Sequence, residues 1–310
     1  MFKFHGASGT TGRSPKRTGL ERLDLSELHF AAEMPAGRAL KLEGRGTTFV
    51  RVAEGPAGAP TILLVHGLFA SADLNWSLAI PELAAEYRVV APDLRGHGDG
   101  IRTRRFDAVE CADDLAAIVE ELALGQVIVV GYSLGGLVAQ VFARRHPDLV
   151  AGLVLCATAH RFAESGGGSM TRLLSRAALL VPESVRRALM MAVLAPRSAP
   201  DSQSTWVMDQ VAKHDTRSIL QAAAEATTFD SSDWLGGLAT PSAVVLTAGD
   251  QVVSAEVQRE LCRVLSNPAV HELEGDHFVC VKEPHVFNTA LVAACADVKS
   301  AAFEKAGTST

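Results

Sequence analysis

Three residues that together can activate a hydroxyl group stand far apart in this 310-residue chain, in the order Ser133, Asp250 and His277. Serine is a weak nucleophile until a neighbouring base removes its proton, and histidine is the side chain that exchanges protons near neutral pH. A carboxylate that holds the imidazole in one tautomer completes such a set. The expected chemistry is attack of Ser133 on an acyl carbon, followed by hydrolysis of the acyl-enzyme by water.

The sequence around Ser133 predicts a sharp turn between a strand and a helix. An apolar run at 127–130 leads into Gly131-Tyr132-Ser133-Leu134-Gly135, and a helix-like segment follows. Flanking glycines suit a strained turn, because glycine tolerates positive φ and has no side chain to collide with nearby backbone. Such a turn exposes a nucleophilic serine beside a helix N-terminus, where N–H groups favour negative charge. On its own, the pattern also fits a tight turn with a capping serine.

Two backbone amides are expected to stabilise the oxyanion that forms during acyl transfer. A continuous apolar strand at 61–66 ends in His66-Gly67, and the loop at its carboxyl end can direct the Leu68 N–H toward the serine. The second donor is the N–H of Leu134, directly after the nucleophile. Loss of one such donor typically lowers the rate about 10²–10³-fold. His66 is interpreted as a residue that shapes the loop.

Asp250 and His277 each follow a predicted strand. Alone, Asp250 could be a turn residue and His277 a surface loop residue, and Asp276 adjoins His277 but is expected to point elsewhere. The order serine, acid, histidine, each just past a strand, is found in one architecture and differs from two other serine hydrolase families. The sequence therefore predicts a catalytic triad of Ser133, Asp250 and His277.

These segments resemble the α/β-hydrolase fold superfamily, in particular its small serine esterase and lipase branch. The resemblance covers residues 45–298 and is carried by VHGLFAS (65–71), APDLRGHG (91–98), GYSLGG (131–136), LTAGDQVV (246–253) and GDHFVCVKEP (275–284). It implies a mostly parallel central sheet with helices on both faces and an inserted helical cap. It also implies hydrolysis with no metal and no organic cofactor. Asp99-Gly100 stands where the family commonly has a serine, which leaves the geometry of that loop open.

The hydrophobic pattern predicts the same alternation of strands and helices. Strands are expected at 47–53, 61–66, 88–92, 126–131, 151–156, 242–248 and 269–273, and helices at 107–123, 134–146, 254–265 and 284–297. The predicted regions are a polar N-terminal tail and lead-in (1–45), an α/β core (46–158 and 239–298), a helical cap (159–238) and a C-terminal tail (299–310).

The cap is expected to roof the active site and to supply much of an apolar substrate pocket. Its helical segments are rich in leucine, alanine and flexible methionine, which suits irregular apolar ligands. The candidate pocket residues are Phe69, Tyr132, Leu189, Met190 and Trp206. Any one of the cap residues could instead pack the cap onto the core. This composition favours a small-molecule ester with an apolar acyl or aromatic group as the substrate.

Composition also restricts partners and location. The net charge of −6 and the pI of about 5.9 argue against nucleic acid. No segment has the ~20 apolar residues of a membrane span, and the first twenty residues lack the apolar core of a secretory signal. Five cysteines without disulfide or metal spacing fit the reducing cytoplasm. Four cap arginines, at positions 172, 176, 186 and 187, leave open a solvated face or peripheral contact with a lipid surface.

Several alternatives to an ester hydrolase stay open, and the sequence does not specify the oligomeric state. Carbon–carbon bond hydrolases, cofactor-free haloperoxidase-like members and aminopeptidase-like members of the family share the triad. A non-catalytic binding protein or receptor on the same fold would hold a ligand without turnover. Epoxide hydrolases and haloalkane dehalogenases of the family carry an aspartate at the elbow, and Ser133 argues against both.

Overall fold

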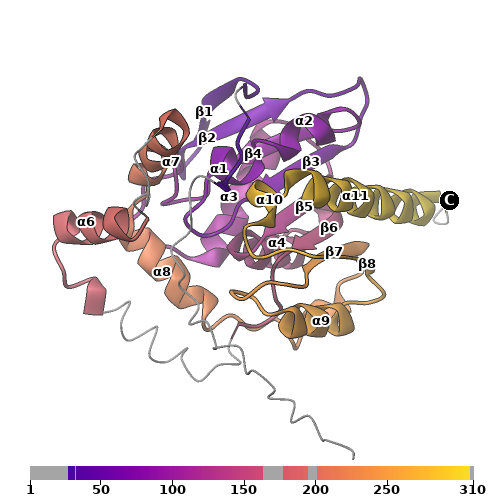
Figure 1. The fold of residues 1–310 in the computed structure, drawn as a ribbon. Helices are drawn as coiled ribbons and strands as arrows, with labels where there is room; N and C mark the ends of the chain where they lie inside the picture. The colour runs from indigo at the N-terminus through magenta and orange to yellow at the C-terminus, as the bar shows by residue number, and fades with distance from the viewer. Residues whose placement is uncertain (1–26, 32, 163–176, 195–200, 308–310) are drawn as a thin grey trace, which may run out of the picture.

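The computed structural model describes residues 27–31, 33–162, 177–194 and 201–307, and an eight-stranded sheet forms its centre (Figure 1). The strand order is β1-β2-β4-β3-β5-β6-β7-β8. β2 pairs antiparallel with β1 and with β4, and the other neighbours are parallel. The predicted α/β architecture with a mostly parallel sheet is thus confirmed. The strands are β1 (Gly37–Leu42), β2 (Gly46–Ala53), β3 (Thr61–Val65), β4 (Arg88–Pro92), β5 (Val127–Tyr132), β6 (Val150–Cys156), β7 (Ser242–Thr247) and β8 (Ala269–Leu273).

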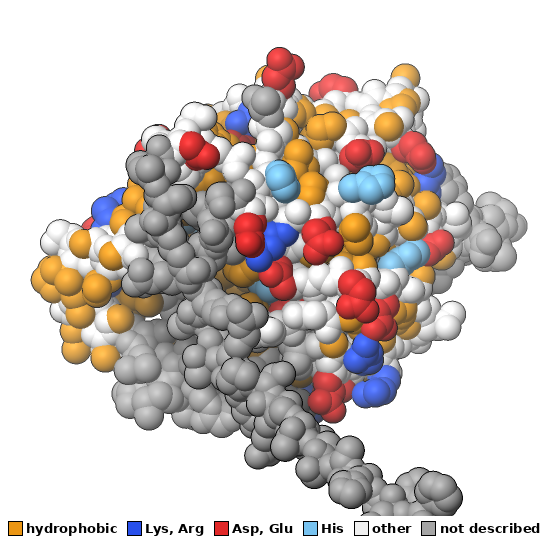
Figure 2. Space-filling view, viewed as in Figure 1, with side chains coloured by type: hydrophobic (Ala, Val, Ile, Leu, Met, Phe, Trp, Pro, Cys, Tyr) orange, Lys and Arg blue, Asp and Glu red, His pale blue; other side chains and the backbone are white. Residues whose placement is uncertain are grey.

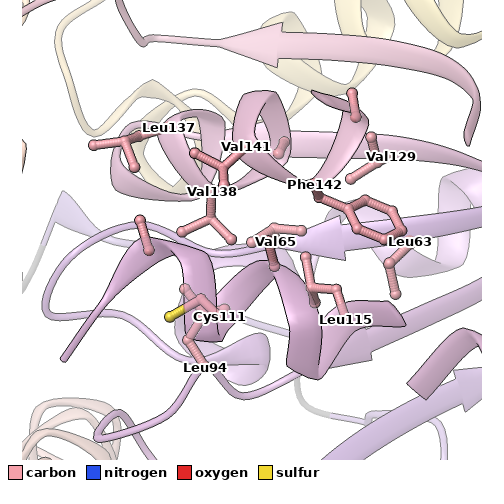
Figure 3. Packing of buried hydrophobic residues seen from close by; sticks show 14 of the residues in the cluster. Leu63, Val65, Leu94, Cys111, Leu115, Val129, Leu137, Val138, Val141 and Phe142 are labelled. Carbon is pink, nitrogen blue, oxygen red and sulfur yellow. The ribbon is translucent and has the colours of Figure 1, made fainter. Parts of the chain in front are cut away.

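Helices cover both faces of the sheet. Leu63 and Val65 of β3 pack against α3 and α4 (Figure 3), whereas Ile62 and Leu64 pack on the opposite face, in the cluster that includes α1, α2 and α11. Burial on both faces explains why the central strands are continuous apolar runs. The helices of the core are α1 (Ala72–Trp76), α2 (Ala79–Ala84), α3 (Ala108–Glu121), α4 (Leu134–Arg145), α9 (Ala255–Val264), α10 (Val279–Lys282) and α11 (Pro284–Gly307).

The structure differs from the sequence predictions near both ends of the described chain. β1 lies inside the region predicted as tail and lead-in, and it extends the sheet by pairing with β2. α11 continues to Gly307, ten residues beyond its predicted end and into the expected C-terminal tail at 299–310. The short helices α1 and α2 were not predicted. Across the described ranges, no helix has both the length and the apolar character needed to cross a membrane.

Between β6 and β7, the described residues include the α-helices α6 (Glu183–Leu194), α7 (Ser202–Ala212) and α8 (Thr216–Ala226), which lie at one side of the sheet (Figure 1). Aspartates begin two of them: Asp201 accepts the Ser204 N–H and Asp215 accepts the Ser218 N–H. Hydrophobic side chains gather over α6 in Figure 2, where Val185 and Leu189 are exposed. Residues 163–176 and 195–200 of the predicted cap, with Arg172 and Arg176, lie outside the described residues.

Three buried histidines lie between the loops that follow β3 and β4 and the loop that joins α7 to α8. The ring centroids of His66 and His97 are 5.3 Å apart, and those of His97 and His214 are 5.6 Å apart. Burial lowers the pKa of each of the three rings to about 3. All three rings are therefore neutral in the folded protein at neutral pH.

These neutral histidines predict that the fold loses stability in acid. A ring with a pKa of about 3 when folded and 6.5 when unfolded takes up a proton on unfolding between those values, so its contribution falls as pH drops below 6.5. Burial raises the pKa of Asp93 from 3.8 to about 6, which acts in the opposite direction. On unfolding between pH 4 and pH 6, the three histidines take up three protons and Asp93 releases one, so unfolding is accompanied by a net uptake of two protons. From these groups, the free energy of unfolding falls by about 3 kcal/mol per pH unit between pH 6 and pH 4.

Urea unfolding at a series of pH values from 4.5 to 7 measures this slope. The substitution His97→Phe keeps an aromatic ring against Phe106 and His214, with which His97 makes edge contacts. Because the variant lacks one ring that is protonated on unfolding, the free energy of unfolding is expected to depend less steeply on pH, by about 1 kcal/mol per pH unit. An unchanged slope in His97→Phe contradicts the assignment of His97 as a buried neutral base.

Candidate active site

Ser133 occupies a strained turn between β5 and α4. Its backbone has φ 52° and ψ −117°, in a region that residues with a side chain rarely adopt. The flanking glycines allow the turn: a Cβ on Gly131 would lie 2.4 Å from the Gly135 carbonyl oxygen, and a Cβ on Gly135 would lie 2.1 Å from the Val65 carbonyl oxygen. The elbow therefore packs directly on the end of β3, and no larger residue fits at either position.

The structure brings Ser133, His277 and Asp250 together from loops after three different strands. His277 Nε2 lies 3.0 Å from Ser133 Oγ, and His277 Nδ1 lies 2.7 Å from Asp250 Oδ2. Because a carboxylate only accepts, Nδ1 carries the ring proton and Nε2 is free to accept the proton of the serine hydroxyl. The Asp250 side chain has no exposed surface, and that of His277 is 11% exposed.

Asp250 is held by several donors besides His277. Its Oδ1 accepts the Val252 and Val253 N–H groups at 2.8 and 2.9 Å, and its Oδ2 accepts the Thr247 hydroxyl at 3.0 Å. Gln258 supports this arrangement from α9, since its Nε2 donates to Thr247 Oγ1 at 2.8 Å. These bonds compensate for the desolvation of a buried carboxylate. The sequence analysis did not identify Gln258, although it shares the buried face of α9 with Leu261.

The loop that carries His277 is fixed from two sides. The Tyr132 hydroxyl donates to the His277 carbonyl oxygen at 2.9 Å, and the Gly249 N–H donates to the Gly275 carbonyl oxygen at 2.9 Å. The second bond joins the loop of the acid to the loop of the base. Asp276 is turned to other partners, as expected: it accepts the Phe278 N–H and pairs with Lys282 Nζ at 3.0 Å.

The two amides predicted as oxyanion donors are available. Within the described part of the chain, neither the Leu68 N–H nor the Leu134 N–H has a hydrogen-bond acceptor, whereas the neighbouring Gly67 N–H donates to Asn75 Oδ1 at 2.8 Å. Phe69 follows with φ 59°, which reverses the backbone at this point. The loop after β3 thus leaves one amide free where an oxyanion donor is expected.

His214 connects this loop to the cap and to the loop after β4. Its Nδ1 accepts the Gly98 N–H at 2.8 Å, so its Nε2 carries the proton and donates to the Phe69 carbonyl oxygen at 3.2 Å. The sequence analysis did not identify His214, because a lone histidine between two helices gives no signal for contacts with residues more than 100 positions away.

A cavity of about 760 Å³ contains Ser133 and His277 in its wall. Four of the five predicted pocket residues line it: Phe69, Tyr132, Leu189 and Met190. Trp206 does not line it, and its ring instead packs on Phe30 at 5.1 Å between centroids. Phe30, on which Trp206 packs, lines the cavity instead.

Two lining residues, Leu28 and Phe30, come from the region predicted as an N-terminal lead-in. The His29 N–H donates to the Val281 carbonyl oxygen at 2.7 Å, and Gln203 Nε2 donates to the Leu28 carbonyl oxygen at 2.6 Å. This short segment is thereby anchored to both α10 and α7. The alternation of Leu28 and Phe30 with polar residues was the one available signal for it in the sequence.

The cavity is mostly apolar, and the Cys280 thiol that lines it is not a competing nucleophile. Burial raises the pKa of Cys280 to about 12, so the thiol is protonated at neutral pH. Burial also raises the pKa of Tyr132 well above its usual value, which keeps the hydroxyl neutral as the donor to His277. Ser133, whose hydroxyl is hydrogen-bonded to His277 Nε2, is accordingly the candidate nucleophile of this cavity.

Comparison with known proteins agrees with this geometry. A family model described as alpha/beta hydrolase fold matches residues 60–284. The chain is 27% identical over 238 residues to the magnesium-chelatase 30 kDa subunit of Rhodobacter capsulatus, which covers 73% of this chain and 83% of that protein. It is 41% identical over 103 residues to a pimeloyl-[acyl-carrier protein] methyl ester esterase of Neisseria meningitidis, which covers 33% of this chain and 38% of the esterase.

Among solved structures, a thermophilic esterase from Thermogutta terrifontis superposes with a TM-score of 0.68 at 23% identity, over 85% of this chain and 99% of that one. At this identity the likeness supports the fold alone. The match of the family model extends over most of the sheet and over all three residues of the Ser133–His277–Asp250 arrangement. The chain belongs to the α/β-hydrolase fold family.

Proposed function

We propose that the protein is a serine hydrolase that cleaves a carboxylic ester of an apolar acyl or aromatic substrate through an acyl-enzyme on Ser133. The observation that carries the proposal is the chain of hydrogen bonds from Asp250 through His277 to Ser133, in the wall of an apolar cavity of about 760 Å³. A large apolar cavity with few polar groups is typical of a site for a small apolar substrate.

In the first half of the reaction, Ser133 Oγ attacks the ester carbonyl carbon and its proton passes to His277 Nε2. Asp250, hydrogen-bonded at Nδ1, stabilises the imidazolium that results. The Leu68 and Leu134 N–H groups donate to the oxyanion. When the tetrahedral intermediate collapses, the carbon–oxygen bond of the leaving alcohol breaks and the alkoxide takes the proton from Nε2.

In the second half, water attacks the acyl group on Ser133 and transfers a proton to His277 Nε2. Collapse of the second tetrahedral intermediate breaks the bond between the acyl carbon and Ser133 Oγ. The proton returns from Nε2 to Oγ and the carboxylic acid leaves. One ester and one water give one alcohol and one acid, and the enzyme is restored.

A non-catalytic ligand-binding protein is the second candidate function. One relative, which matches 73% of this chain, is named as a subunit of a magnesium chelatase, and that name states no hydrolysis. The same cavity could then hold an apolar ligand without turnover. Carbon–carbon bond hydrolysis and haloperoxidase-like chemistry stay alternatives of the enzyme class, because they use the same three side chains.

Covalent labelling separates the enzyme from the binding protein. A fluorophosphonate reacts with a serine only where a base and an oxyanion site activate it. Wild type is expected to gain the mass of one phosphonyl group, and Ser133→Ala to gain none, as read by intact-protein mass spectrometry. Heat-unfolded wild type serves as the control for non-specific reaction. Absence of labelling in folded wild type would favour the binding protein.

Replacement of the buried acid tests the role of its charge. Asp250→Asn keeps the shape of the side chain but cannot stabilise the imidazolium or fix the same tautomer of His277. The turnover number for a p-nitrophenyl ester is expected to fall by about 10³–10⁴-fold. Asp276→Asn, one position before His277 and bonded to Phe278 and Lys282 instead, is the matched control and retains activity close to wild type. Equal losses in the two variants contradict the assignment of Asp250.

A further inference from the structure

One permanently charged side chain faces the otherwise apolar cavity. Arg186 of α6 lines the cavity together with Thr216, and no other lining residue in the described part of the chain carries a permanent charge. The neighbouring cap residues that line it are apolar, and they include Leu189, Met190 and Ile219. Arg186 is half-buried, so its head group lies at the edge of the cavity and its charge is only partly shielded from solvent.

The contacts of Arg186 with the described residues are all to neutral acceptors. Its Nε donates to the Thr216 hydroxyl at 3.2 Å, and its Nη1 donates to the carbonyl oxygens of Val181 at 2.5 Å and Leu179 at 3.5 Å. All three acceptors are neutral. Among the described residues, Nη2 has no acceptor and no carboxylate forms an ion pair with this guanidinium. The head group is thus fixed in position while two N–H donors stay unused.

The carboxylates that adjoin Arg186 and its partner Thr216 in sequence have other partners. Glu183, one turn earlier on α6, pairs with Arg187 at 3.3 Å. Asp215, directly before Thr216, accepts the Ser218 N–H at 2.8 Å at the start of α8. The cap therefore places a held guanidinium at the cavity and directs both nearby acids elsewhere.

We infer that the cavity takes a substrate whose apolar acyl chain ends in a carboxylate, and that Arg186 binds this carboxylate while Ser133 attacks the ester at the other end. A guanidinium presents paired N–H donors that match a carboxylate. One guanidinium compensates one negative charge, so a phosphate monoester, with a charge of about −1.5 to −2 at pH 7, would leave charge uncompensated in an apolar cavity. The substrate class is thus the half-ester of an aliphatic dicarboxylic acid. This inference rests on the proposed ester hydrolysis.

Matched substrates and variants test the inference. p-Nitrophenyl hexanoate and mono-p-nitrophenyl adipate have acyl chains of the same length and differ by the terminal carboxylate. Wild type is expected to have the higher kcat/KM on the adipate half-ester. In Arg186→Gln, the ratio of the two kcat/KM values falls by about 10–100-fold, as expected for loss of a hydrogen bond to a charged group, and the change lies in KM. Arg186→Lys keeps the charge and retains part of the ratio.

Arg187→Gln is the control, since Arg187 is adjacent on the same helix, bonds to Glu183 and the Ala212 carbonyl oxygen, and does not line the cavity. Its ratio is expected to equal that of wild type. A series of half-esters from succinate to suberate gives the chain length that spans Ser133 and Arg186. The inference is wrong if Arg186→Gln lowers kcat/KM equally for both esters, which is the result of a purely structural role.

A binding measurement separates this inference from the proposed hydrolysis. Calorimetry on Ser133→Ala compares adipic acid monoamide with hexanamide, neither of which requires turnover. Tighter binding of the monoamide that is lost in Ser133→Ala/Arg186→Gln supports the carboxylate site even if the wild type hydrolyses no ester. Equal binding of the two amides overturns the carboxylate site even if ester hydrolysis is demonstrated.

Discussion

The buried carboxylate of Asp250 is the group on which the arrangement of the active site depends. Asp250 accepts hydrogen bonds from two backbone N–H groups of its own loop, which follows β7. It also accepts a hydrogen bond from the imidazole Nδ1 of His277, on the loop after β8. Through His277 it also fixes the position of the base relative to Ser133, which follows β5. A buried charge with this many donors is stable only in one geometry, because loss of any donor leaves a desolvated charge poorly compensated. The triad is therefore held by the core alone.

The oxyanion loop depends on the cap as well as on the core. The Phe69 carbonyl oxygen accepts from His214, which lies between α7 and α8, and His214 in turn accepts the Gly98 N–H. Because burial keeps the pKa of His214 near 3, this bridge between donor and acceptor persists through the neutral range. Movement of the α7–α8 loop would thus be transmitted to the Leu68 amide. Preorganised donors contribute most when they need not move during the reaction, and the hydrogen bond of His214 to Phe69 would help to hold the predicted donor loop in place.

The parts that the sequence predicted well are those with a local and periodic signal. Each strand at the centre of the sheet is a continuous apolar run, and the order of Ser133, Asp250 and His277 after such strands is readable without a structure. β1 escaped prediction because only Leu40 and Leu42 of its six residues are buried. Gln258 is polar yet buried, and its partners become visible only when α9 is packed on β7. Trp206, predicted as a pocket residue, packs instead on Phe30, a contact between positions far apart in the sequence that no local pattern announces.

The Asp250–His277–Ser133 arrangement and the cavity wall opposite it come from different parts of the molecule. The reacting groups lie on loops at the carboxyl ends of β3, β5, β7 and β8, where parallel strands bring them to one edge of the sheet. The cavity wall opposite them comes from α6, α7, α8 and the segment around Phe30, none of which contributes to the triad. Relatives can share the triad geometry and act on different compounds, because changes in the cap leave the Asp250–His277–Ser133 bonds intact. Under the proposed ester hydrolysis, cap residues such as Arg186, rather than the three residues of the Asp250–His277–Ser133 arrangement, would select the acyl group.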